Sequence, residues 1–264
     1  MSAARVRSWH LLRVLWRTLF LQACWNFQRM QNLGFAFALD PLLRVIYREP
    51  AARVNALRRH TDFFVTHPYF ASLILGVTAR LEADRAEAGE AEQAAVNQIK
   101  AGMMGPLAAL GDSLFWATLK PLWALLGVVL VWLTPAGETW PAWAGPVVFL
   151  VAFTACHLSV RAGGLWAGFA RGLGIVQDLR RLRLQAVVNQ LMLVLAVVAG
   201  GAAAAYVAVH RAELGGGAVA PVAFAAVSGA ALWGLRRGLS VSTLLYGFIV
   251  LGLAAAVLGW RPGR

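Results

Sequence analysis

The chain has 264 residues, of which 59% are hydrophobic and only 14% are charged, and its mean hydropathy is +0.64. A soluble domain carries about 25% charged residues, so this composition excludes an ordinary soluble protein and indicates a membrane protein. The formal charge of +12 does not indicate nucleic-acid binding. The arginines flank apolar segments, where the positive-inside rule places them, and no basic, polar domain accompanies them.

Residues 8–25 are predicted to form an amphipathic helix. Leu12 and Leu15 fall at helical spacing on one side, and Arg13 and Arg17 fall on the other. Such a helix can lie in the membrane interface, with its apolar face among acyl chains and its arginines near phosphates. In the alternative, the apolar face packs against the protein itself.

A dense group of amides follows in the segment CWNFQRMQNLGF, residues 24–35. Amide side chains both donate and accept hydrogen bonds, which suits a neutral ligand rich in hydroxyls, such as a sugar. In the alternative, the amides belong to a solvated turn between two helices. The candidate binding residues in this segment are Asn26, Gln28, Arg29 and Gln31.

The next part of the chain is predicted to be helical. Residues 31–48 are apolar, and residues 51–66 form an arginine-rich, polar segment. His67 and the proline after it open a new helix, since proline is tolerated in a first turn. This histidine is a candidate ligand-binding residue, although a structural, hydrogen-bonded role is more common. Residues 80–100 are predicted to be charged and exposed, with Glu82 among their acids.

Residues 101–121 are predicted to form a re-entrant or broken helix, because the first half of this segment is rich in helix-weakening residues. These are Gly102, Gly105, Pro106 and Gly111. Breaks at membrane depth are tolerated where the backbone is buried in protein or lines a cavity. Asp112 follows the break, and an acid within a membrane is a candidate functional residue. In the alternative, Asp112 only caps a helix that begins at Ser113.

Five apolar segments, each long enough to cross a hydrocarbon core, occupy the second half of the chain. They are residues 117–134, 144–161, 185–209, 218–235 and 241–259. The basic connections between them predict a cytoplasmic N-terminus and an external C-terminus. We therefore expect an all-α integral membrane protein. It would contain amphipathic N-terminal helices, re-entrant or broken helical hairpins and about five transmembrane helices.

These segments are expected to form a single domain over residues 1–264. Residues 1–66 would hold the amphipathic, interfacial helices and the polar motif, residues 67–121 the re-entrant or broken region, and residues 117–260 the transmembrane helices. The sequence shows no P-loop, no pair of catalytic acids and no metal-ligand spacing. We therefore expect no cofactor, no metal and no catalytic residue.

Three stretches closely resemble the IID component of the mannose/fructose/sorbose family of the bacterial phosphoenolpyruvate-dependent sugar phosphotransferase system. They are FLQACWNFQRMQNLGFAFAL, RRHTDFFVTHPYFASLILGVTARLE and AAVNQIKAGMMGPLAALGDSLFW. The resemblance continues more weakly through the apolar second half. It implies a subunit of the bacterial inner membrane that pairs with a IIC membrane protein, in the family as a trimer of heterodimers with an elevator-like moving core. Together they would bind and translocate a hexose, which cytoplasmic IIA and IIB domains phosphorylate. No nucleic-acid partner is implied.

The chain departs from the family pattern in three places. Gln28 replaces the usual glutamate of Trp-Asn-Phe-Glu-Arg-Met-Gln, Ser113 replaces the usual proline of Gly-Asp-Pro, and the loop at residues 210–217 is short. A non-transporting membrane scaffold that recruits IIB-type phosphocarrier proteins is therefore the alternative function. An integral membrane enzyme is disfavoured, because His67 and Asp112 lack an identifiable third partner.

Overall fold

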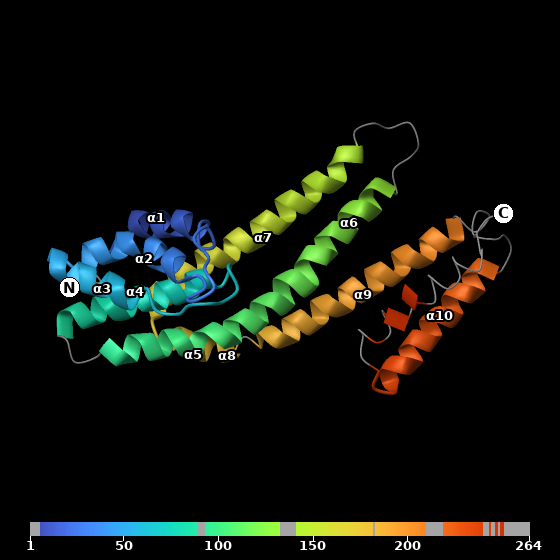
Figure 1. Ribbon diagram of the computed structural model, residues 1–264. Helices are drawn as coiled ribbons and strands as arrows, with labels where there is room; N and C mark the ends of the chain where they lie inside the picture. Colours follow the sequence, from blue (N-terminus) through green and yellow to red (C-terminus); the bar gives the residue numbers. More distant parts are fainter. Residues whose placement is uncertain are drawn as a thin grey trace. The chain divides into compact units, whose positions relative to one another are not determined.

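A computed structural model of the protein describes residues 6–88, 93–132, 141–181, 183–209 and 219–239, together with residues 243, 246, 247, 249 and 250. In this part of the chain every regular element is a helix (Figure 1), which confirms the predicted all-α class. The chain divides into two compact units, Met1–Leu195 and Ala196–Arg264, and most of the predicted functional residues lie in the first.

The first unit begins with four helices that pack on one another. They are α1 (Ser8–Thr18), α2 (Asn32–Ile46), α3 (Pro50–Arg59) and α4 (Ala71–Ala88). Helix α2 contacts each of the other three. Helix α1 turns Leu11 and Val14 into the protein and leaves Leu12 and Trp16 exposed. The predicted packing on the protein is therefore confirmed for one apolar strip, and a place for the exposed strip in the membrane interface stays a prediction.

The predicted break in residues 101–121 is wrong. Three helical elements follow one another there without interruption: α5 (Gln93–Gly111), the π-helix η3 (Asp112–Leu119) and α6 (Lys120–Trp132). Pro106 lies inside α5. In a membrane every backbone polar group needs an internal partner, which favours continued helical hydrogen bonding over an open break. The hydrogen-bond spacing changes directly after Gly111, from the α to the wider π arrangement.

The alternative role for Asp112, as a helix cap, is also wrong. Gly111, the residue before it, already has right-handed helical φ and ψ angles of −65° and −43°. Asp112 therefore stands inside a continuous helix and not at a helix start. The two neighbouring hydroxyls bond back to the helix, Ser113 to the carbonyl of Ala109 at 2.9 Å and Thr118 to the carbonyl of Ser113 at 2.7 Å.

The remaining described helices are α7 (Pro141–Arg171), α8 (Gly174–Arg181), α9 (Leu184–Val209) and α10 (Val219–Arg236). Among the described residues, three helical stretches are long and apolar enough to cross a membrane. They are Val96–Trp132, Trp143–Arg171 and Leu184–Val209. The apolar part of α10, Val222–Arg236, is shorter. Most of the fifth predicted segment, residues 241–259, lies outside the described residues.

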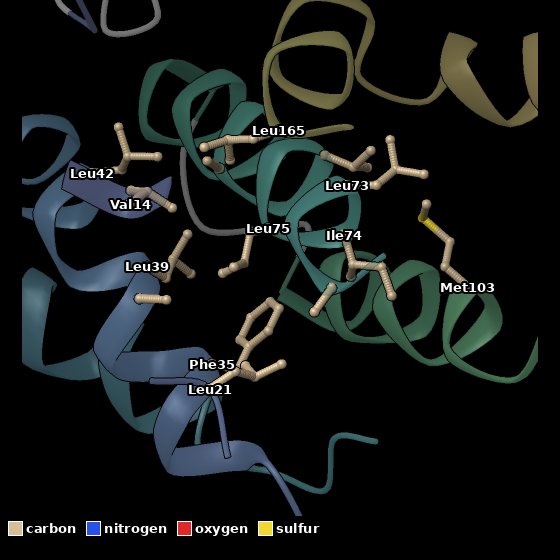
Figure 2. Close-up of a cluster of buried hydrophobic side chains, with 14 of the residues drawn as sticks. Val14, Leu21, Phe35, Leu39, Leu42, Leu73, Ile74, Leu75, Met103 and Leu165 are labelled. Carbon is tan, nitrogen blue, oxygen red and sulfur yellow. The ribbon is translucent and has the colours of Figure 1, made fainter. Parts of the chain in front are cut away.

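The hydrophobic core of the first unit joins the N-terminal helices to α7 (Figure 2). Phe35 and Leu39 point from α2 toward Ile74 and Leu75 of α4, and all four are fully buried. On the other side of α4, Leu73 lies close to Leu165 of α7. Helix α4 therefore stands at the centre of this core, between α2 and α7.

Glycines let α4 and α7 approach backbone to backbone. A Cβ atom on Gly76 would lie 2.3 Å from the carbonyl oxygen of Leu165, and one on Gly168 would lie 2.6 Å from that of Leu73. Helices in lipid associate through such close packing of small residues. Helices α6 and α7, which lie side by side in Figure 1, also approach each other closely at a glycine, Gly127.

Candidate functional site

His67 packs against the junction of α5 and η3. Its ring is 2% exposed and stacks on Phe115 of η3, with ring centroids 5.2 Å apart and planes 13° apart. A Cβ atom on Gly111 would lie 2.3 Å from the His67 side chain, so only glycine fits at this point of the helix. The structure therefore brings His67 beside the residue that directly precedes Asp112.

One ring nitrogen of His67 has no hydrogen-bond partner among the described residues. The backbone N–H of Tyr69 donates to Nδ1 at 3.3 Å, which leaves Nε2 to carry the proton of the neutral ring. That Nε2 atom is buried and has no hydrogen-bond partner among the described residues. Burial, and then the charge of Arg161, lower the pKa of His67 to about 4. His67 is therefore neutral near pH 7 and can offer a hydrogen-bond donor.

A set of aromatic and cationic side chains surrounds His67. Tyr69 stacks on His157 of α7, with ring centroids 4.5 Å apart. The guanidinium carbon of Arg161 lies over the Tyr69 ring, 4.9 Å from its centroid, and Arg161 donates hydrogen bonds to the backbone and hydroxyl oxygens of Thr18. Trp116 of η3 lies 5.4 Å from His67 and is 43% exposed. Sequence reasoning missed these residues, which come from η3, α7 and the loop before α4.

Asp112 lies on the outer side of η3. Its side chain is exposed, and no described residue forms a hydrogen bond or ion pair with its carboxylate. It is four residues from Trp116, so both occupy neighbouring positions about one helical turn apart. A bare carboxylate within an apolar span is unfavourable in lipid. The carboxylate of Asp112 therefore requires a polar cavity or a protein surface opposite η3 in place of lipid.

The amides of the polar motif at residues 24–35 hold the loop between α3 and α4. Gln31 pairs with Thr66 in both directions: its amide donates to the Thr66 carbonyl at 3.1 Å, and its oxygen accepts the Thr66 backbone N–H at 3.2 Å. Asn32 donates to the carbonyl of Thr61 at 2.6 Å. Gln31 and Asn32 are both buried. These bonds give the amides a structural role, and contact of Gln31 with a sugar stays a prediction.

The remaining motif residues divide into bonded and free groups. Asn26 accepts the backbone N–H of Arg29 at 2.8 Å and donates to the side chain of Asn32 at 3.0 Å. The guanidinium of Arg29 donates to the carbonyl of Thr61 at 3.1 Å. Gln28 is exposed, and its amide has no partner among the described residues. Of the predicted site residues, Gln28, His67 and Asp112 thus keep unpaired polar atoms.

A buried ionic cluster lies at the other end of α4, where the sequence suggested an exposed charged helix. That prediction is wrong for Glu82, which is fully buried. Tyr47 donates to its carboxylate at 2.6 Å, His60 Nε2 lies 2.9 Å from it, and Arg59 forms an ion pair with it. Burial alone would raise the pKa of Glu82, but the bonds from Arg59, His60 and Tyr47 hold it well below its usual range.

The sequence does contain a signal for this burial. Glu82 continues a stripe of buried residues on one face of α4, after Leu75, Thr78 and Ala79. Spacing of three and four residues places these positions on one side of a helix. The partners of Glu82 were not predictable, because they come from the residue after α2 and from the end of α3.

Long apolar helices and the polar groups gathered beside them define the class of this molecule as a helical integral membrane protein. Its family follows from comparison with known proteins. The family model described as "PTS system mannose/fructose/sorbose family IID component" matches residues 5–260. The chain therefore belongs to the IID components of the mannose/fructose/sorbose family of sugar phosphotransferase systems, as the sequence motifs predicted.

Several relatives carry related names. The chain is 42% identical over 167 residues to the mannose-specific EIID component of Escherichia coli strain K12, covering 63% of this chain and 56% of that protein. It is 41% identical over 160 residues to the sorbose-specific EIID component of Lacticaseibacillus casei, covering 61% and 54%. The alignments thus span little more than half the length of these relatives.

Two solved structures have a similar fold over nearly the whole chain. One is a chain in the cryo-electron microscopy structure of the mannose transporter ManYZ with microcin E492. Its TM-score is 0.58 and its identity 32%, covering 96% of this chain and 97% of that one. The other, described as a membrane protein, has a TM-score of 0.70 and 31% identity, covering 97% and 98%. The helical architecture is therefore that of a membrane transporter.

Proposed function

We propose that this chain is the membrane subunit of a sugar phosphotransferase permease that pairs with a IIC subunit. The pair would bind and translocate a hexose of the mannose/fructose/sorbose class, and partner IIA and IIB domains would phosphorylate it. The main support is the family match over residues 5–260, together with the likeness to the mannose transporter ManYZ over 96% of the chain. The chain itself would carry no catalytic residue.

The sugar would bind beside η3, against the IIC partner. Asp112 can accept hydrogen bonds from sugar hydroxyls, and the exposed ring of Trp116 can stack on an apolar sugar face. His67 lies next to this surface with an unpaired Nε2 donor. We keep Asn26, Gln28, Arg29 and Gln31 as residues of the same polar region. Asn26 and Gln31 would act there mainly by fixing the loop that carries His67.

The orientation rests on the charges of the connections. Arg180, Arg181 and Arg183 would lie on the cytoplasmic side, because basic loops stay inside. The N-terminus would then be cytoplasmic and the C-terminus external. That orientation counts both α10 and residues 241–259 as spans beyond the three long ones. We further propose that the heterodimers assemble as trimers in the bacterial inner membrane.

The alternative is a non-transporting scaffold that recruits IIB-type phosphocarrier proteins. One observation favours it: Gln28 is exposed and unpaired where the family usually has an acid. An amide cannot replace a carboxylate as a charged acceptor. A scaffold would still assemble with IIC and bind IIB, but it would not move sugar.

Uptake of labelled hexoses by vesicles that contain this chain and its IIC partner, with IIA and IIB supplied, tests the proposal. We expect uptake to depend on both membrane subunits and to drop strongly in Asp112→Asn, while insertion and assembly stay normal. Asp84→Asn, a change to an exposed acid of α4, is the matched control. Normal assembly without any uptake in the parent protein would favour the scaffold, and full uptake by Asp112→Asn would remove Asp112 from the site.

A further inference from the structure

Helix α1 and the second half of α2 form a surface groove of about 610 Å³ that the proposed sugar site does not use. The walls are aromatic and aliphatic, and three arginines stand among them. The lining residues are Trp9, His10, Leu12, Arg13, Trp16, Arg17, Pro41, Arg44 and Val45.

The apolar side chains of this groove face outward. Trp9 is 45% exposed, Leu12 is 55% exposed and Trp16 is 65% exposed. Exposed tryptophans of membrane proteins gather at the level of lipid headgroups, because the ring is apolar and its N–H is polar. An amphipathic helix with such a face lies in the plane of the interface. The exposed side chains of the groove are therefore of the kind found where phospholipids meet a protein.

The basic residues of the groove exceed the acids that could neutralise them. Arg17 and Arg44 share one carboxylate, Asp40, at 3.1 Å and 2.9 Å. Arg13 stacks over Trp9, with its guanidinium carbon 4.4 Å from the ring centroid. No carboxylate among the described residues pairs with Arg13. Three arginines thus lie near a single acid, so the groove has a net positive charge that an added anion can neutralise.

We propose that this groove binds one anionic phospholipid. The phosphate would lie against Arg13 and Arg44, because guanidinium groups bind phosphate oxygens in a bidentate manner. An acyl chain would lie along Leu12 and the two tryptophans. A free phosphate ion would match the arginines but would leave the apolar wall uncovered. The lipid would also tie α1 to α2, the helix that anchors the amide motif.

Lipid binding is measurable on the full chain in detergent, with and without its IIC partner. Native mass spectrometry would follow retention of phosphatidylglycerol, with phosphatidylcholine and inorganic phosphate as comparison probes. We expect Arg13→Gln to weaken phosphatidylglycerol retention by about 5-fold and Arg13→Gln with Arg44→Gln by roughly 30-fold. Quenching of tryptophan fluorescence by brominated phosphatidylglycerol should fall in parallel when Trp9 and Trp16 are changed to phenylalanine.

The matched control removes the same charge nearby. Arg48 and Arg53 lie in or before α3 and do not line the groove, so Arg48→Gln with Arg53→Gln should leave retention unchanged. An equal loss in this control would overturn the site in favour of unspecific charge attraction. Equal retention of phosphatidylcholine, equally tight binding of inorganic phosphate, or displacement of the lipid by the IIC partner would overturn it as well.

Discussion

Glu82 is a buried carboxylate that depends on three partners from two other segments, the end of α2 and the end of α3. It is fully buried, and Tyr47, Arg59 and His60 surround both of its oxygens. A carboxylate removed from water needs such paired and hydrogen-bonded surroundings. The cluster therefore holds α4 to the ends of α2 and α3.

Replacing this carboxylate should destabilise the first unit. Removal of one partner from a buried ion pair costs about 3–5 kcal/mol, so we expect Glu82→Ala to lower the thermal unfolding midpoint strongly in detergent. Asp84→Ala is the control, because the Asp84 pair with Arg80 is exposed and such pairs contribute little. Equal midpoints for the two variants would show that the buried cluster contributes nothing.

His67 should make stability depend on pH in a defined window. Its pKa falls from 6.5 to about 4 on folding, mainly through burial and then through Arg161. A depressed histidine pKa adds stability above pH 6.5, and this contribution is lost as the pH falls toward 4. The loss should reach roughly 2 kcal/mol, measured as the fall in unfolding free energy between pH 7 and pH 4.5.

His67→Phe separates this contribution from those of other groups. Phenylalanine can keep the stack on Phe115 but cannot titrate, so the variant should show a shallower pH dependence than the parent. His60 is also buried with a lowered pKa, and its share stays in both proteins. Identical slopes in the parent and the variant would mean that His67 already titrates normally in the folded state.

At the scale of single residues, the polar side chains were predictable from the sequence, but their hydrogen-bond partners were not. The motif was recognisable as polar, but Gln31 and Asn32 bond to backbone groups of Thr66 and Thr61, 35 and 29 positions away. Hydrogen bonds to a distant backbone leave no side-chain pattern in the sequence. His67 and Asp112 were identified because each stands out in apolar surroundings, whereas Trp116 looked like one more apolar residue.

At the scale of elements, the contact between α4 and α7 depends on the absence of two side chains. Gly76→Ala or Gly168→Ala would place a methyl group within 2.3 or 2.6 Å of a carbonyl oxygen on the opposite helix. Such overpacking typically costs about 1–3 kcal/mol. We expect both variants to unfold at lower temperature in detergent, as measured by differential scanning fluorimetry.

Gly163 provides the control on α7 itself. A Cβ atom there meets nothing within 4 Å, and alanine is favoured over glycine in a helix by about 1 kcal/mol. Gly163→Ala should therefore be neutral or slightly stabilising. A loss at Gly163 as large as at Gly76 would show that helix contact is not the cause.

Elements were predictable where length and hydropathy decide the outcome. The long apolar segments became α6, α7 and α9, because hydrocarbon demands a helix of about that length. The continuity of the helix before Asp112 was not predictable from Pro106, because a low helix propensity does not say whether the helix opens or changes its hydrogen-bond spacing. Tertiary packing of His67 on Phe115 accompanies the π-helix, and that contact joins distant parts of the chain.

At the scale of the whole molecule, α9 is an apolar helix whose side chains are mostly left uncovered by the residues that the structure describes. Its most apolar window has a mean hydropathy of 2.3, and none of that window is buried. Lipid alone can cover such a helix, but its many glycines and alanines suit close packing against another helix. A IIC subunit is the partner that the proposed function requires.

Co-purification measures this dependence. We expect the chain expressed alone to be poorly dispersed in detergent, and the chain expressed with a IIC partner to elute as one stable complex. An unrelated membrane protein of similar size, expressed in place of IIC, should not have this effect. A monodisperse chain that ignores IIC would contradict the heterodimer.

The π-helix has a consequence for the surfaces of the span that contains it. Each π-helical residue turns the chain through a smaller angle than an α-helical residue does, because its hydrogen bonds reach one residue further. Over the eight residues of η3 this lag accumulates, so α6 is rotated about its axis relative to an uninterrupted continuation of α5. A helical wheel drawn through Val96–Trp132 at the α-helical angle would therefore assign the wrong side to residues after Leu119, including Gly127, which faces α7.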